Sequence, residues 1–132
     1  PRSKAKAEEV ITELYGFKEE GMEVLFKPTK ASEVPIRHDY DQAVSYFVGA
    51  AAAGDDIGIK EDKGFAINPW TAVRFENSKT ILNADSATAM GEYYFTTLEG
   101  TVAKVEYTFQ YKRGADGNLK IVVHHSSLPY SP

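Results

Sequence analysis

Cysteine is absent from the 132 residues of this chain, and histidine occurs only three times. Without cysteine the chain can form no disulfide, and it offers neither a thiolate nucleophile nor a sulfur ligand for zinc. The imidazoles belong to His38, His124 and His125. A zinc site made of histidine alone would need all of them to converge on one point.

An excess of positive charge is also missing, because 15 basic residues stand against 19 acidic ones and the formal net charge is -4. Such a chain repels a phosphate backbone, and no stripe of lysine or arginine counters that repulsion. Long apolar runs are missing too, both behind the opening Pro1 to Lys4 and elsewhere in the sequence. We therefore expect no signal peptide, no membrane span and no nucleic-acid partner.

What the chain does contain is typical of one soluble globular domain. Hydrophobic residues make up 42% and charged residues 26% of the sequence. Both values fall within the range of ordinary folded proteins, and the length suits a single core. We predict one domain that covers residues 1–132.

Two amphipathic helices are predicted in the first half of the chain. The first would be capped by Ser3 and end at Gly16, with apolar residues at helical spacing between them. The second would begin after Asp39, which a glutamine follows three residues later in a capping-box pattern. Its apolar stripe ends at Gly49 or Gly54.

Strands dominate the rest of the chain. Alternating residues at 22–26 predict a first strand, and residues 55–69 form a long loop. The later strands are expected at Val73–Glu76, Thr80–Asn83, Ala87–Thr97, Val102–Arg113 and Leu119–Ser127. The turns between them, including one at residues 77–79, are too short for a crossover helix, so the sheet should be mainly antiparallel. Helices packed on one face of this sheet give a two-layer α+β fold.

The last predicted strand carries two similar pairs of residues on opposite faces. Because side chains alternate along a strand, His125 and Ser127 share one face, and His124 and Ser126 share the other. The first pair continues the more apolar face, which favours His125 and Ser127 as the inward pair. A β-bulge would reverse this assignment and turn the other pair inward.

Neither a serine hydrolase nor a histidine-only metal site is favoured. No G-x-S-x-G elbow occurs in the sequence. His124 and His125 point to opposite faces, so they cannot easily bind the same zinc ion. One histidine with Asp39 or Asp41 could form a mixed zinc or manganese site, which remains an alternative. His38 is expected to be a solvated loop residue.

Two hydroxyl residues could reach a cavity from other elements. Tyr46 lies at the edge of the second helix's apolar stripe, and Thr29 follows the predicted first strand. The remaining aromatic residues mostly have strand or helix spacing, which indicates core positions. Examples are Tyr93, Tyr107, Phe109 and Tyr111.

Short motifs spread over nearly the whole chain together resemble the iota-class carbonic anhydrases. They are Val24-Leu25-Phe26-Lys27-Pro28-Thr29-Lys30-Ala31, Ser45-Tyr46-Phe47, Gly64-Phe65-Ala66, Pro69-Trp70, Ala89-Met90-Gly91, Tyr107-Thr108-Phe109 and the terminal His124-His125-Ser126-Ser127-Leu128-Pro129. The last of these is the most specific. The family is similar to the association domain of calcium/calmodulin-dependent kinase II. It belongs with the nuclear transport factor 2-like (cystatin-like) folds, so the resemblance implies a cone in which a curved sheet wraps the N-terminal helices.

The resemblance also implies an activity and a site. The activity is reversible hydration of carbon dioxide to bicarbonate in an apolar pocket, with no metal cofactor. Threonine, tyrosine and serine hydroxyls would bind the substrate and donate hydrogen bonds to its oxygens, and a nearby histidine would accept a proton. The matched residues are Thr29, Tyr46, His125 and Ser127, with His124 and Ser126 as the alternative on the other strand face.

Two other functions fit the same fold. A small-ligand-binding or isomerase domain would use a pocket carboxylate such as Asp39 or Asp41, and an assembly module would form rings without catalysis. We expect a homodimer through the outer face of the sheet, because residues 102–113 carry apolar side chains on both faces. The compartment is unknown, and the resemblance suggests a plastid or a bacterial periplasm.

Overall fold

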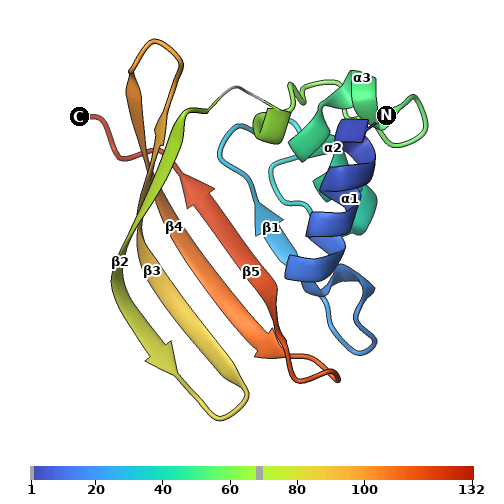
Figure 1. The fold of residues 1–132 in the computed structure, drawn as a ribbon, viewed down its shortest axis with the longest axis vertical. Helices are drawn as coiled ribbons and strands as arrows, with labels where there is room; N and C mark the ends of the chain where they lie inside the picture. The colour runs from blue at the N-terminus through green and yellow to red at the C-terminus, as the bar shows by residue number, and fades with distance from the viewer. Residues whose placement is uncertain (1, 68–69) are drawn as a thin grey trace.

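A computed structural model describes residues 2–67 and 70–132, which form a sheet with helices packed on one side of it (Figure 1). The helices are α1 (Arg2–Leu14), α2 (Tyr40–Val48) and α3 (Ala50–Ala53), with short 3₁₀ turns η1 (Gly16–Lys18) and η2 (Phe65–Ile67). The strands are β1 (Leu25–Lys27), β2 (Ala72–Leu82), β3 (Ser86–Thr96), β4 (Val102–Arg113) and β5 (Leu119–Ser127). The predicted two-layer α+β architecture is confirmed.

The five strands lie in the order β1-β5-β4-β3-β2. Strands β2 to β5 pair antiparallel, and β1 joins β5 in parallel at the edge next to the helices. The sheet is therefore mainly antiparallel, as predicted. Because β1 and β5 are neighbours, the segment after β1 lies beside the C-terminal strand, although about a hundred residues separate the two in sequence.

Strand β2 is one continuous strand with a bulge, so the predicted turn at residues 77–79 is wrong. The pairing of β2 with β3 shifts register between Asn77 and Lys79 without ending. Asn77 lies opposite Gly91, where an added Cβ would come within 2.3 Å of the Glu76 carbonyl oxygen. The missing side chain lets the β2 backbone lie close against β3, and the extra residue is absorbed as a bulge.

The second predicted helix has the expected cap and stops at Gly49, one of its two predicted ends, while the other, Gly54, follows a separate short helix. The Asp39 carboxylate accepts a hydrogen bond from the Gln42 backbone N–H at 2.9 Å. Helix α2 ends at Gly49 and α3 ends at Gly54, and both glycines have a positive φ. The first helix already includes Ser3, so its start differs from the predicted one.

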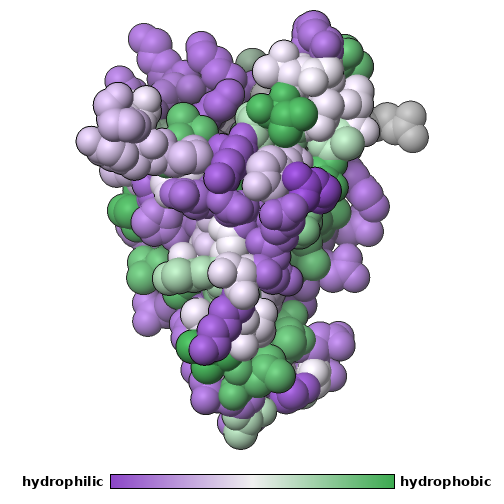
Figure 2. Space-filling view, turned by 90° about the vertical axis from the view of Figure 1, so that its left-hand side faces the viewer, coloured by the Kyte–Doolittle hydropathy of each residue, from purple (hydrophilic) through white to green (hydrophobic). Residues whose placement is uncertain are grey.

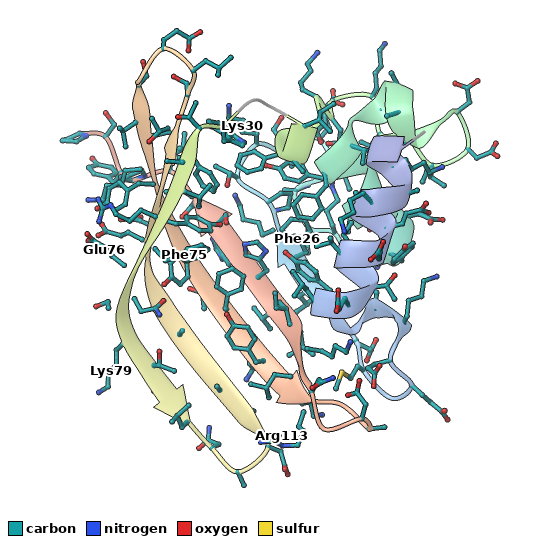
Figure 3. All side chains as sticks on the ribbon, viewed as in Figure 1. Phe26, Lys30, Phe75, Glu76, Lys79 and Arg113 are labelled. Carbon is teal, nitrogen blue, oxygen red and sulfur yellow. The ribbon has the colours of Figure 1, made fainter. Side chains whose placement is uncertain are left out.

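The core lies between the helices and the concave face of the sheet. Phe26 of β1 is at its centre and is 1% exposed (Figure 3). In β2, Phe75 lies on the concave face of the sheet but is 57% exposed, whereas Glu76 and Lys79 point away from the helices (Figure 3). Within the described residues, no helix is long and apolar enough to cross a membrane.

The sheet extends beyond the helices toward the β2–β3 hairpin (Figure 1). There Ile81 and Leu82 are 55% and 78% exposed. Figure 2 shows the molecule from the β2 side, with apolar surface near its lower end and hydrophilic surface around it.

Candidate active site

Strand β5 turns His124 and Ser126 inward, so the predicted inward placement of His125 and Ser127 is wrong. His124 is 8% and Ser126 2% exposed, whereas His125 is exposed. His125 and Ser127 line a hollow on the outer face of the sheet. The alternative assignment made from the sequence, in which a β-bulge reverses the two faces, is confirmed.

The reversal has a local cause at Val122. On β4, Gln110 pairs with Val123 and the next residue, Tyr111, pairs with Ile121. Val122 is left without a partner, and this extra residue shifts the alternation of β5 by one position. Ile121 and His124 consequently both face the core.

Three hydroxyl groups surround the His124 imidazole. The Tyr15 hydroxyl is hydrogen-bonded to Nδ1 at 2.7 Å. On the other side of the ring, the Tyr93 and Ser126 hydroxyls lie 3.1 and 3.2 Å from Nε2 and are hydrogen-bonded to each other. Both ring nitrogens are therefore satisfied by neutral hydroxyls.

Aromatic rings cover both flat sides of this imidazole. Phe26 and Phe109 stack on it with centroid distances of 4.9 and 4.2 Å. Burial lowers the pKa of His124 to about 3, and the charge of neighbouring His125 contributes in the same direction. The desolvated ring is thus neutral at ordinary pH and has little basicity. Burial also raises the pKa of Tyr93 to about 12 and holds that of Tyr15 above its usual range.

Tyr46 and Thr29 form a second group of hydroxyls, which the structure brings together as predicted. Tyr46 is 4% exposed, and its oxygen accepts a hydrogen bond from the Lys30 backbone N–H at 3.3 Å. Burial raises the pKa of Tyr46, while the contacts with Lys30 and the Thr29 side chain oppose that rise. The oxygen accepts from Lys30, and the phenolic hydrogen can be donated to the Thr29 hydroxyl or to a bound substrate.

Phe26 connects the two groups of hydroxyls. Its ring packs edge-on against Tyr46 at 5.7 Å and stacks on His124 at 4.9 Å. Tyr46 also lies near enough to Tyr93 to add, after burial, to the raised pKa of Tyr93. Thr29, Tyr46, His124 and Ser126 therefore belong to one region of the cone interior.

The wall beside Tyr46 is aromatic. Phe65 stacks on Tyr46 at 5.7 Å and packs edge-on against Phe95 at 5.2 Å. Trp70 packs against both phenylalanines, and its indole N–H donates to the Phe65 carbonyl oxygen at 3.0 Å. The predicted long loop therefore supplies part of the site, while its residues 68 and 69 lie outside the described residues.

A buried ion pair lies behind Tyr46 and was not predicted from the sequence. The Arg37 guanidinium donates to both Asp62 carboxylate oxygens at 2.8 and 2.9 Å, and neither side chain is exposed. The Ser45 hydroxyl, one residue before Tyr46, donates to the same carboxylate at 2.6 Å. This network ties α2 to the long loop and so fixes the position of Tyr46.

Tyr15 and Tyr93 were also missed as site residues. Tyr93 was predicted to be a core residue, which is correct, but the role of its hydroxyl depends on the fold. Tyr15 lies just past the end of α1, more than a hundred residues from His124 in the sequence. No local pattern relates either tyrosine to the terminal strand.

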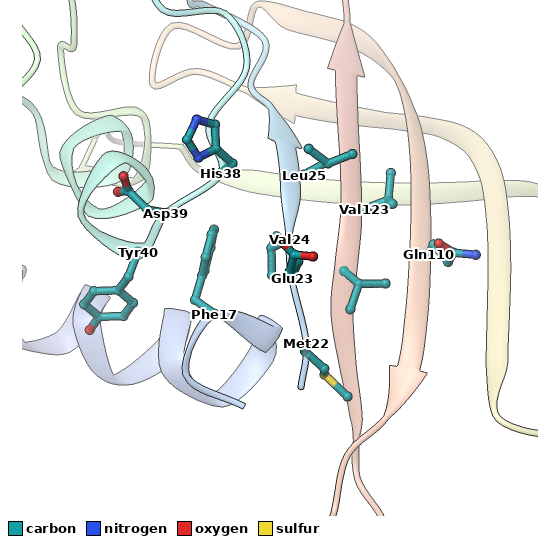
Figure 4. Close-up of a pocket in the computed structure, with 11 residues that line it drawn as sticks. Phe17, Met22, Glu23, Val24, Leu25, His38, Asp39, Tyr40, Gln110 and Val123 are labelled. Atoms are coloured by element: carbon teal, nitrogen blue, oxygen red, sulfur yellow. The ribbon is translucent and has the colours of Figure 1, made fainter. Parts of the chain in front are cut away.

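The residues considered for a metal or an isomerase site lie elsewhere. His38 and Asp39 line an open hollow of about 600 Å³ beside β1 (Figure 4). Both are exposed, and so is Asp41, while the Asp39 carboxylate caps α2. Among residues 2–67 and 70–132, no group of three or more histidine and acidic residues is placed to hold a metal ion.

Comparison with known proteins identifies the family of this chain. The model of the family described as metal-independent carbonic anhydrase matches residues 1–128. A curated relative, the metal-independent carbonic anhydrase of Nostoc sp. (strain PCC 7120 / SAG 25.82 / UTEX 2576), is 40% identical over 129 residues, which are 97% of this chain and 60% of the relative. The chain thus spans 60% of the length of this relative.

Solved structures support the fold at two levels of similarity. The iota-carbonic anhydrase from a cyanobacterium, complexed with bicarbonate, superposes with a TM-score of 0.86 at 38% identity, over 98% of this chain and 75% of that one. A putative ketosteroid isomerase from Parabacteroides distasonis gives 0.63 at 17% identity, over 97% and 80% of the two chains. A putative calcium/calmodulin-dependent protein kinase II association domain from Xanthomonas campestris gives 0.62 at 22%, over 99% and 81%.

The last two similarities show the fold alone, and they agree with the expected α+β architecture. The family match is of a different kind, because it runs through every element that builds the inner site, from Tyr15 to Ser126. On this evidence the chain belongs to the metal-independent carbonic anhydrase family.

Proposed function

We propose that this chain hydrates carbon dioxide reversibly to bicarbonate, without a metal, at the inner face of β5. The observation that carries the proposal is the buried set of hydroxyls around Phe26 and His124, in a chain of this family. The proposed site residues are Thr29, Tyr46, His124 and Ser126. His125 and Ser127, which the strand pattern favoured, are not part of it, because they face outward.

The surroundings suit a small apolar substrate. The rings of Phe26, Phe65 and Phe95 form an apolar wall beside the hydroxyls, so carbon dioxide can be held there with little competition from water. During attack by water a new C–O bond forms, and negative charge develops on the substrate oxygens. One proton of the attacking water leaves to a second water molecule or a buffer base.

Catalysis in such a site depends on hydrogen-bond donors that are in place before the charge develops. Tyr46 can donate its phenolic hydrogen to a substrate oxygen, and the Ser126 hydroxyl lies in the opposite group. Thr29 is adjacent to Tyr46 and can serve the same oxygens. Each donor of this kind is typically worth about 10²- to 10³-fold in kcat.

The test is stopped-flow carbon dioxide hydration by the purified chain after dialysis against a chelator, with elemental analysis of the same sample. We expect activity that survives chelation, with far less than one metal ion per chain. A Tyr46→Phe variant should lose about 10²- to 10³-fold in kcat. Activity that disappears on chelation and returns with one added metal would overturn the proposal, as would an inactive wild-type chain.

We also propose a homodimer through the outer face of the sheet. Its support is the exposure of Leu25, Met90 and Val102 on that face, at 56%, 58% and 56%. The sequence predicted this dimer from an apolar outer face on β4, and that argument does not hold. The outward residues that alternate with the inward ones are mostly polar, namely Lys104, Glu106, Thr108 and Gln110. Sedimentation velocity should give a dimer that Met90→Lys weakens, and a monomer at all concentrations would contradict this.

A further inference from the structure

The His124 ring has two possible neutral forms, and its neighbours decide between them. One form carries the hydrogen on Nδ1, which faces Tyr15, and the other carries it on Nε2, which faces Tyr93 and Ser126. The two forms offer different chemistry to a substrate, because one presents an acceptor and the other a donor at Nε2.

The Tyr15 hydroxyl settles the choice through its own hydrogen. Within residues 2–67 and 70–132, Nδ1 of His124 is the one hydrogen-bond partner of this hydroxyl, and Tyr15 is 6% exposed. If Nδ1 carried the hydrogen, the Tyr15 O–H would be buried without an acceptor, which costs about 1 to 3 kcal/mol. If Tyr15 donates to Nδ1, both groups are satisfied and the imidazole hydrogen lies on Nε2.

The position of the imidazole hydrogen also sets how many polar hydrogens are available around Nε2. With the hydrogen on Nε2, the group of Nε2, Tyr93 and Ser126 holds three polar hydrogens. One is used between the imidazole and a hydroxyl, and one between the two hydroxyls. The third is left for a substrate oxygen. With Nε2 unprotonated, both hydroxyl hydrogens would be used inside the group and none would remain.

We propose that Tyr15 is a positioning residue, which holds His124 in the Nε2–H form and thereby makes the Ser126 group a hydrogen-bond donor to the substrate. The role of His124 is then to orient donors and not to take the proton of the attacking water. This inference rests on the proposed hydration activity for its catalytic consequence, but the ring form itself does not depend on that activity.

The backbone keeps Tyr15 in place for this role. Its N–H donates to the Ile11 carbonyl oxygen at 2.9 Å, and it forms an isolated parallel bridge with Ile121 of β5. Its ring is packed against Phe26 and Phe47 at 5.9 and 6.3 Å. The hydroxyl is therefore tied to the same strand that carries His124, with little freedom to turn away.

The experiment is a long-range ¹H–¹⁵N correlation spectrum of the ¹⁵N-labelled chain at pH 7, with the His124 ring assigned by its loss in His124→Gln. We expect the protonated-nitrogen resonance at Nε2 and the unprotonated one at Nδ1. In Tyr15→Phe the preference should weaken, so the Nε2 resonance moves toward the unprotonated value. The value of kcat/KM should also fall, by at most the factor of about 10² to 10³ that one donor is worth.

Tyr40→Phe is the matched control. It also removes a tyrosine hydroxyl that contacts α1, by donating to the Glu8 carbonyl oxygen, but it leaves His124 untouched. This variant should keep both the His124 resonances and the rate. A wild-type ring with its hydrogen on Nδ1 would overturn the inference, and so would a Tyr15→Phe variant with unchanged resonances and rate. An inactive wild-type chain with the expected resonances would refute the proposed function and leave the ring assignment standing.

Discussion

The two faces of β5 carry nearly the same residues in opposite environments. His124 and Ser126 face the core, with the imidazole stacked between phenylalanines and hydrogen-bonded at both nitrogens. His125 and Ser127 lie one residue further along and line an open hollow on the outer face, beside Glu92 and Glu106. Residue type is thus the same on both faces, and burial alone makes one pair a candidate site.

Charged groups show the same contrast. Arg37 and Asp62 form a bidentate pair with no exposure of either side chain. Arg74 and Glu76 pair on the outer face with side chains 60% and 51% exposed. A pair removed from water is costly to break, whereas an exposed pair contributes little to stability. The comparison of inner and outer faces can be tested at each of these positions.

The largest effect is expected at the buried ion pair. Asp62→Asn keeps the shape of the side chain but leaves Arg37 without its charge partner, which should reduce the free energy of unfolding by about 3 to 5 kcal/mol. The presence of Glu61 at 3.5 Å from Arg37 favours the lower end of that range. Urea unfolding measures the change, and Glu76→Gln on the outer face is the control. Equal losses in both variants would remove the contrast.

The next effect concerns activity. Ser126→Ala should lower kcat for carbon dioxide hydration by about 10²- to 10³-fold, because it removes a preorganised donor. Ser127→Ala, one residue away on the other face, should change kcat less than about 2-fold. Stopped-flow assays of both variants test this. A larger loss in Ser127→Ala would move the site to the outer face.

The pH dependence of stability should also distinguish the two histidines. The pKa of His124 is about 3 in the folded chain against an ordinary value of 6.5. Between these values the unfolded chain binds a proton that the folded chain does not, so stability is complete above pH 6.5 and falls as the pH drops. The loss should approach about 1.4 kcal/mol per pH unit. Urea unfolding at a series of pH values measures this slope. His124→Gln should flatten the slope between pH 6.5 and 5, whereas His125→Gln should retain it.

The smallest effect is expected at an exposed pair of the outer face. Lys104 and Glu92 are 2.7 Å apart, with side chains 46% and 32% exposed. Solvent and salt weaken such a pair, so Lys104→Ala should cost far less stability than Asp62→Asn. Urea unfolding at low and high salt provides the measurement. A loss comparable to that of Asp62→Asn would show that exposure does not decide the value of a charge pair here.

Much of the fold could be predicted from periodicity and turn chemistry. The cap at Asp39, the glycine ends of α2 and α3, and the antiparallel order of the later strands all depend on neighbouring residues. The turn predicted at residues 77–79 failed because its outcome depends on Gly91, which is distant in sequence and opposite in the sheet. Local patterns cannot distinguish a bulge from a turn in that case.

The site was predicted only in part, for the same reason. Thr29 and Tyr46 were named from their positions in the sequence and from the family resemblance, and the structure places their side chains in contact. The choice between the two pairs on β5 depended on one unpaired residue, Val122, which apolar alternation does not reveal. Tyr15, Tyr93 and the pair of Arg37 with Asp62 are brought to the site by tertiary packing, so no spacing in the sequence marks them.

The most direct test of the account is an experimental structure of this chain with bicarbonate bound. The account predicts bicarbonate inside the cone, within hydrogen-bonding distance of the Tyr46 and Ser126 hydroxyls. Bicarbonate in the outer hollow beside His125 and Ser127, with the inner site empty, would contradict it.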